Sequence, residues 1–244
     1  MNAVALVTGA SRGIGAATAL ALAEQGCDLA INCLTQREKA DQVAAQVRAM
    51  GRQAIVIQAD VADYDQVQQM VAQTVAQLGG LHVLVNNAGY SSHGTLDQLT
   101  PDAWRRMVGV TLDGAFFCAK AAAPHMRTAG WGRIVNVCSL RAMTGSDHGS
   151  HYASAKAGLI GLTKSLALEL APQVLVNGIC PGFTATDMNR KALEAKGAEI
   201  RAKIPLQRVA EPRDIACVIA FLCSEGMNYV TGETINVNGG IYMR

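Results

Sequence analysis

Hydrophobic positions along the chain form short continuous runs that alternate with longer segments of helical periodicity. The runs predict strands at residues 3–8, 28–33, 53–58, 81–86, 133–138, 174–180 and 234–238. The periodic segments predict helices at 14–25, 38–50, 64–78, 101–126, 152–170 and 212–223. Strands that are apolar on both faces and separated by helices indicate a parallel sheet covered on both sides.

This order of elements predicts an α/β fold of the Rossmann type. Right-handed crossovers would give a doubly wound parallel sheet of about seven strands, with helices on both faces. The chain shows no repeat, low-complexity tract or linker, so we expect residues 1–244 to form a single domain. The charged stretch at 183–211 has the weakest pattern and lies between a strand end and a helix, where we expect a substrate lid.

Composition and charge narrow the class of protein. A formal net charge of +2 gives no basic footprint for nucleic acid. No apolar run reaches the ~18 residues of a membrane span, and the first residues lack the basic region of a signal peptide. The seven cysteines contain no C-x-x-C pair, which favours buried thiols over disulfides or zinc. We therefore expect a cytoplasmic protein without a metal centre and without nucleic-acid or membrane partners.

A glycine-rich turn follows the first predicted strand. Gly9, Gly13 and Gly15 have the spacing G-x-x-x-G-x-G and precede a helix. Glycines permit a tight turn and allow backbone N–H groups to approach a pyrophosphate at the start of a helix. A plain tight turn is the alternative. The position after the first strand of a doubly wound sheet favours a dinucleotide site.

The end of the second predicted strand bears on the choice between NAD and NADP. Sites for NAD usually carry an acid there to bind the ribose 2′-hydroxyl. This chain has Cys33, while Arg12 and Arg37 lie close by in the sequence. A missing acid and a nearby guanidinium fit a 2′-phosphate. NADP(H) is the predicted cofactor, and a solvated loop charge is the alternative interpretation of Arg12.

Tyr152 and Lys156 are four residues apart on a predicted helix and therefore share one face. The pair could be an ordinary surface contact. The alternative is chemical, because a nearby cation stabilises phenolate and lowers the pKa of a tyrosine. Such a tyrosine could exchange protons near neutral pH.

Together these motifs resemble the short-chain dehydrogenase/reductase family over essentially the whole chain. The family's T-G-x-x-x-G-x-G corresponds to Thr8, Gly9, Gly13 and Gly15, and its N-N-A-G to residues 86–89. The remaining motif residues, in chain order, are Asp60, Val61, Ser139, Tyr152, Lys156, Pro181, Gly182, Thr184 and Thr186.

The resemblance implies a role for each motif. Tyr152 would exchange a proton with the substrate oxygen, Ser139 would hydrogen-bond that oxygen, and Lys156 would lower the tyrosine pKa and hold the nicotinamide ribose. Asp60 would cap the adenine. The implied cofactor-binding residues are Gly9, Ser11, Arg12, Gly13, Ile14, Gly15, Asp60, Val61, Asn87, Ala88, Gly89, Tyr152, Lys156, Pro181, Gly182, Thr184 and Thr186.

One position departs from the family pattern. Many members carry an asparagine in the helix after N-N-A-G, where it shapes a helix irregularity and holds a water behind the lysine. This chain has Thr111 instead. Threonine offers a hydroxyl but no amide that can donate and accept together. We therefore expect a slower or pH-shifted enzyme.

The substrate is left open between several classes. The stretch at 229–243 resembles 3-oxoacyl-(acyl-carrier-protein) reductases, which implies a 3-oxoacyl thioester. Glu169 replaces a basic docking residue, although Arg127 and Arg133 remain, so the carrier protein is an uncertain partner. Arg141, Asp147, His148 and His151 make a polar wall that favours a small polar ketone or alcohol, such as a sugar or polyol. A non-catalytic NADP-binding protein is the third interpretation of the function.

The family resemblance also implies a homotetramer formed through the helices at 101–126 and 152–170.

Overall fold

Within the described part of the chain, seven strands form one parallel sheet, as the sequence predicted. The structure is a computed structural model that describes residues 3–243. The strands lie in the order β3-β2-β1-β4-β5-β6-β7, and every pairing is parallel. Their bounds are β1 (Ala3–Val7), β2 (Cys27–Cys33), β3 (Ala54–Gln58), β4 (Val83–Asn86), β5 (Gly132–Val137), β6 (Val174–Pro181) and β7 (Thr234–Val237).

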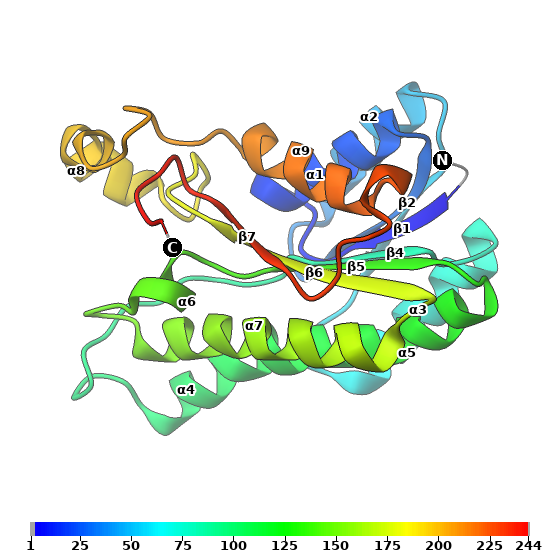
Figure 1. Cartoon of the computed structure of the whole chain (residues 1–244), viewed down its shortest axis with the longest axis horizontal. Helices are drawn as coiled ribbons and strands as arrows, with labels where there is room; N and C mark the ends of the chain where they lie inside the picture. The colour runs from blue at the N-terminus through cyan, green and yellow to red at the C-terminus, as the bar shows by residue number, and fades with distance from the viewer. Residues whose placement is uncertain (1–2, 244) are drawn as a thin grey trace.

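Helices cover both faces of this sheet (Figure 1). One layer contains α1 (Gly13–Glu24), α2 (Arg37–Ala49) and α9 (Pro212–Cys223). The opposite layer contains α3 (Tyr64–Leu78), α5 (Gly114–Thr128) and α7 (Ser150–Leu170). The doubly wound arrangement expected from the order of runs is confirmed. It places the loops that follow the strands along one edge of the sheet, where the candidate site lies.

Side chains alternate between the two layers along each central strand. In β1, Ala5 and Val7 pack under α1 and α9, whereas Leu6 packs into the layer of α3 and α5. In β4, Val85 packs toward the layer of α1 and α9, and Leu84 packs toward the layer of α3 and α5. This alternation follows from the two-residue period of a strand. Both faces are apolar because both are buried, which explains the continuous runs in the sequence.

The predicted helix at 101–126 is interrupted in the structure. It is divided into α4 (Pro101–Val108), a π-helical turn η1 (Gly109–Asp113) and α5. At the end of this turn, a Cβ on Gly114 would lie 2.9 Å from Val61 Cγ2. The glycine therefore allows the helix to pass close to the loop after β3. The wider π turn is the irregularity that the family resemblance implied at Thr111.

The stretch at 183–211 is more regular than the sequence suggested. It contains α8 (Arg190–Ala202), whose backbone departs from helical geometry at Lys196. Two further short elements were not predicted, namely α6 (Arg141–Thr144) and the 3₁₀ turn η2 (Glu225–Met227). Elements of three or four residues contain too little periodicity to be recognised in a sequence.

The cysteines lie almost entirely inside the molecule. Six of them are buried and only Cys217 is exposed. Burial raises the pKa of Cys27 to about 11 and that of Cys118 to about 12. The prediction of buried thiols is therefore confirmed for six positions. Within residues 3–243, no helix has the length and apolar character needed to cross a membrane.

Candidate active site

The turn between β1 and α1 requires glycine at two positions for different reasons. Gly9 has a φ of 61°, in the left-handed region, and a Cβ there would lie 2.9 Å from Ala88 Cα. At Gly15, a Cβ would lie 2.5 Å from both the Gly9 carbonyl oxygen and Asn87 Nδ2. Any side chain would therefore push apart the two loops that form this end of the site.

The first turn of α1 is open to an anion. Its N-cap residue, Arg12, makes no side-chain capping hydrogen bond, and the first turn contains no acidic residue. The first N–H groups of a helix have no intrahelical acceptor, and the helix dipole favours negative charge there. Together with the close backbone approach at Gly9 and Gly15, this geometry fits the pyrophosphate of a dinucleotide.

The amide side chains of two asparagines hold the turn in place. Asn87 Nδ2 donates to the carbonyl oxygens of Thr8 (2.9 Å) and Gly9 (3.0 Å), so this predicted binding residue also positions the glycine loop. The Gly9 N–H donates to Asn32 Oδ1 at 3.1 Å. Asn32 was not identified from the sequence. The available signal was a polar residue inside an otherwise apolar strand, which must be hydrogen-bonded when buried.

Ser139, Tyr152 and Lys156 come together at the other end of the site. Ser139 follows β5, and its Oγ accepts a hydrogen bond from the Arg141 N–H at 3.1 Å. Tyr152 and Lys156 lie one turn apart on α7. Lys156 is 5% exposed, and its Nζ donates to the Val137 carbonyl oxygen at 2.6 Å. A solvated surface pair, the alternative considered from the sequence, is therefore excluded.

The expected effect of Lys156 on Tyr152 is wrong in this structure. Burial raises the pKa of Tyr152, and a hydrogen bond from Ser139 and the charge of Arg141 only partly oppose this shift. The Lys156 Nζ lies over the phenol ring, 5.9 Å from its centroid, with its hydrogen bond directed at β5. Burial also lowers the pKa of Lys156 itself to about 8. The spacing placed the two residues together but could not reveal that desolvation dominates.

One cleft of about 1250 Å³ joins the glycine turn to this triad. Its walls contain all three candidate catalytic residues. They also contain most of the predicted cofactor-binding residues, namely Gly9, Arg12, Gly13, Ile14, Asn87, Gly89, Tyr152, Lys156, Pro181, Gly182, Thr184 and Thr186. The remaining five, Ser11, Gly15, Asp60, Val61 and Ala88, do not line it.

The comparisons with known proteins agree with this geometry. A family model described as enoyl-(acyl carrier protein) reductase, of the short-chain dehydrogenase type, matches residues 9–242. The chain belongs to the short-chain dehydrogenase/reductase family. It is 42% identical to a 3-oxoacyl-(acyl-carrier-protein) reductase of Staphylococcus aureus over 100% of this chain and 99% of that one. It is 43% identical to such a reductase of Synechocystis over 98% and 97% of the two chains.

Solved structures of short-chain dehydrogenases superpose closely on the chain. A glucose/ribitol dehydrogenase-type member from Brucella melitensis has a TM-score of 0.93 and 36% identity, covering 100% of this chain and 98% of its own. A blue fluorescent protein from a metagenomic library, crystallised with NADPH, has a TM-score of 0.92 and 38% identity. It covers 99% of this chain and 98% of its own. The oxidoreductase family is thus established at the level of both sequence and fold.

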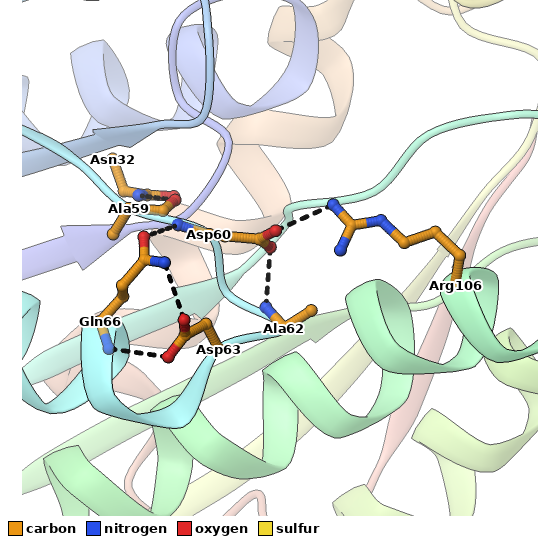
Figure 2. A network of polar contacts seen from close by, with 7 residues as sticks. All are labelled: Asn32, Ala59, Asp60, Ala62, Asp63, Gln66 and Arg106. Carbon is orange, nitrogen blue, oxygen red and sulfur yellow. Dashed lines mark hydrogen bonds and ion pairs between the residues drawn. The ribbon is translucent and has the colours of Figure 1, made fainter.

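Asp60, the family residue predicted to cap the adenine, is bound within the protein (Figure 2). Its Oδ1 accepts from the Ala62 N–H at 2.9 Å, and its Oδ2 forms an ion pair with Arg106 Nη2 at 2.9 Å. The Asp60 N–H donates to Gln66 Oε1. The carboxylate thereby connects the loop after β3 to α4. A role toward adenine stays a prediction, and Arg106 is a partner that the sequence did not reveal.

Of the three residues on which the prediction of a 2′-phosphate site rests, only one lines the cleft. Cys33 is buried at the end of β2, and Arg37 pairs with Asp41 on α2, so neither lines the cleft. Arg12 does line it, and its Nη1 forms an ion pair with Asp187 Oδ2 at 2.8 Å. Asp187 belongs to the segment predicted to form the lid. Only Arg12 thus remains as a cleft cation among the arguments for NADP.

Thr111 lies within the π turn η1 and is 2% exposed. Its hydroxyl donates to Met107 Sδ at 3.6 Å, one turn earlier. A thioether is a weak acceptor, so this contact fixes the hydroxyl without relaying a proton. The departure from the short-chain dehydrogenase pattern therefore leaves a weak O–H···S hydrogen bond at this position.

Two features of the substrate wall were missed or misread. His151, expected in a polar wall, is completely buried, and its Nε2 lies 2.6 Å from Ser92 Oγ. Ser92 lines the cleft but was not identified, because a serine in a loop carries no sequence signal of its own. His148, by contrast, is exposed and pairs with Asp147.

Proposed function

We propose that this chain is an NADP(H)-dependent oxidoreductase that interconverts a carbonyl compound and its alcohol. The single observation that carries the proposal is the continuous cleft from the glycine turn to Ser139, Tyr152 and Lys156. The bound nicotinamide would supply or accept the hydride. The protein must then hold the substrate oxygen and move one proton, and the triad provides the groups for both tasks.

The hydrogen bonds around Ser139 support a defined role for its hydroxyl. Because Ser139 Oγ accepts the Arg141 N–H, its own hydrogen is left to donate, and it is directed toward the Tyr152 hydroxyl, where the substrate oxygen would lie. Donation to the substrate oxygen would polarise the carbonyl. Tyr152 would then transfer its phenolic proton to that oxygen as the hydride reaches the carbon, giving an alcohol and a phenolate.

The raised pKa of Tyr152 favours the direction of reduction. A phenol whose pKa is raised by burial stays protonated at neutral pH, which is the form that reduction consumes. The Lys156 ammonium would stabilise the phenolate formed in this step. Oxidation of the alcohol needs the phenolate at the start and should therefore become faster as the pH rises.

The names of the two relatives favour 3-oxoacyl thioesters as the substrate class. The complex of a structural neighbour with NADPH supports the cofactor. A second candidate is a small polar ketone or hydroxy compound, supported by Ser92, Arg141 and His148 in the cleft wall.

Arg133 cannot bind a carrier protein at the surface, because it is 2% exposed and stacks on Trp131. We further expect the protein to form a homotetramer in the cytoplasm.

The test combines a substrate panel with cofactor binding. Acetoacetyl thioesters, neutral ketones and simple sugars are assayed by NADPH absorbance, and dissociation constants are measured for NADPH and NADH. Tyr152→Phe should lower kcat by about 10²- to 10⁴-fold while NADPH still binds. Tyr229→Phe is the matched control, because that side chain is fully exposed outside the cleft. No turnover of any compound with intact NADPH binding would favour the non-catalytic reading, and tighter binding of NADH would refute the cofactor assignment.

A further inference from the structure

Arg141 is held at the reacting end of the cleft. It begins α6, two residues after Ser139, and its backbone N–H is the donor to Ser139 Oγ. Its half-buried side chain lines the same cleft as Ser139 and Tyr152. The guanidinium Nη1 lies 3.4 Å from the carbonyl oxygen of Gly145, the residue that ends α6, and Gly145 lines the cleft as well.

Within the described part of the chain, this guanidinium has no carboxylate partner. Among residues 3–243, Arg141 forms no ion pair, and its Nη1 makes only a long hydrogen bond of 3.4 Å to the Gly145 carbonyl oxygen. Arg12 and Arg106, by contrast, each have a carboxylate within 2.9 Å. Asp147 is directed to the His148 ring. Most of the five donors of Arg141 are therefore available to an anion in the cleft.

Ser92 supplies a second donor. The His151 ring is fully buried, with Nε2 at Ser92 Oγ and without a partner for Nδ1 in the described part of the chain. A buried N–H without an acceptor is rarer than a bare acceptor, so we assign the hydrogen to Nε2. Burial, together with the nearby charge of His93, lowers the pKa of His151 and so favours the neutral ring. Ser92 Oγ then accepts from the ring, and its own hydrogen can be donated into the cleft.

The loop of Ser92 is joined to the loop that follows Arg141. The Gly94 N–H donates to the His148 carbonyl oxygen at 3.0 Å, and the rings of His93 and His148 lie 4.9 Å apart between centroids. Ser92 and Arg141 therefore line the cleft from two loops that are in contact, although they are almost fifty positions apart in the sequence.

We propose that Arg141 and Ser92 form a subsite for a carboxylate, so that the substrate is a short-chain oxo acid or the corresponding hydroxy acid. This inference rests on the proposed function and specifies its second candidate substrate class, the small polar ketone or hydroxy compound, in place of the thioester. In the reduction, the hydride adds to the oxo carbon and the Tyr152 proton to its oxygen. The carboxylate is unchanged and serves only for recognition. A planar guanidinium matches the two oxygens of a carboxylate, which a thioester lacks.

The test compares substrates that differ only in this charge. Oxo acids of four or five carbons, with the oxo group at position 2, 3 or 4, are assayed with NADPH beside their methyl esters. The wild-type kcat/KM should be higher for at least one acid than for its ester. Arg141→Met should lower kcat/KM for that acid by about 10- to 100-fold, as expected for losing hydrogen bonds to a charged group. The ester should change by less than about threefold.

Three further variants sharpen the result. Arg141→Lys should restore part of the activity toward the acid, because the charge returns without the planar fork. Ser92→Ala should raise KM for the acid more than for the ester. Arg105→Met is the matched control, since Arg105 is exposed on α4, pairs with Asp102 and lies outside the cleft. It should leave both substrates unchanged.

Several outcomes would overturn the proposal. If wild-type enzyme prefers every ester to its acid, or if Arg141→Met lowers both activities equally, the carboxylate subsite is refuted and the oxidoreductase function stands. In the second case Arg141 would act through Ser139 or Tyr152 alone. If no carbonyl compound is reduced while NADPH still binds, the proposed function fails and this inference fails with it.

Discussion

The hydroxyl of Thr111 donates a hydrogen bond to the sulfur of Met107, which is a weak acceptor. Replacing Thr111 with Asn would place an amide in the π turn that can both donate and accept. We expect kcat to rise about tenfold, equivalent to ~1.4 kcal/mol of barrier, with the NADPH dissociation constant nearly unchanged. Steady-state kinetics and equilibrium binding test this. A fall in kcat would mean that the site has adapted to threonine.

The buried ammonium of Lys156 makes stability depend on pH in a defined direction. Burial lowers its pKa from 10.5 to about 8, so between these values the unfolded chain binds more protons than the folded one. Stability must then rise with pH across this window, and the penalty is fully present below pH 8. The free energy of unfolding of the wild type, relative to Lys156→Met, should increase by ~2 kcal/mol between pH 7 and pH 9.5, because this interval covers about 1.5 of the 2.5 pH units. Urea unfolding at pH 7 and pH 9.5 measures the difference, and a flat profile would contradict it.

Single residues differ in how much the sequence reveals about them. Ser139, Tyr152 and Lys156 could be predicted because their residue types and their spacing, both visible in the sequence, define the proton-transfer group. The pKa of Tyr152 could not, because it depends on burial by residues distant in sequence. The ion pair of Asp60 with Arg106 and the contact of Ser92 with His151 join positions 46 and 59 residues apart. No local pattern records such pairings.

At the scale of elements, the segment between β6 and α9 contacts the cofactor end of the cleft through the carboxylate of Asp187. Asp187 forms an ion pair with Arg12, the cation that we propose for the 2′-phosphate, and a longer one of 3.8 Å with Lys39 Nζ. Asp187→Asn should therefore strengthen NADPH binding about two- to fivefold, because an exposed ion pair contributes at most ~1 kcal/mol. NADH binding should stay constant.

Isothermal titration with both cofactors measures this effect of Asp187. The matched control is Asp41→Asn, which removes the same charge from the Arg37 pair outside the cleft. An equal gain for NADH would show that the change acts on general electrostatics and not on the 2′-phosphate.

The regular elements were predictable where a strand is buried on both faces or where a helix is buried along one periodic face. Each predicted strand exists within one or two residues of its expected bounds, because a strand buried on both faces must be continuously apolar. The π turn was not predictable from periodicity, since one extra residue in a turn barely disturbs a helical pattern. The helix α8 was missed because its face is mostly charged and exposed, with Gly197 and Ile200 as its buried residues.

At the scale of the molecule, apolar side chains remain exposed on the long helices. Phe116 on α5 is 42% exposed and Leu168 on α7 is 84% exposed. Helices with such faces pair well across a symmetric interface. We expect a homotetramer of 222 symmetry, with about four times the chain mass of 25.6 kDa in light scattering at micromolar protein. Leu168→Glu should shift the assembly toward dimers or monomers. A monomeric wild type would contradict the prediction.

Because six of the seven thiols are buried, a thiol reagent should react with the folded protein at one cysteine. Cys217, on α9, is the one exposed cysteine, whereas the pKa values of buried thiols such as Cys118 and Cys223 are raised. A maleimide dye added to the folded chain should therefore attach once and at a known position, without any mutagenesis. Titration of the remaining six thiols would then count molecules that have opened globally. The same chain thus carries both a site for a fluorescent label and an internal reporter of its own unfolding.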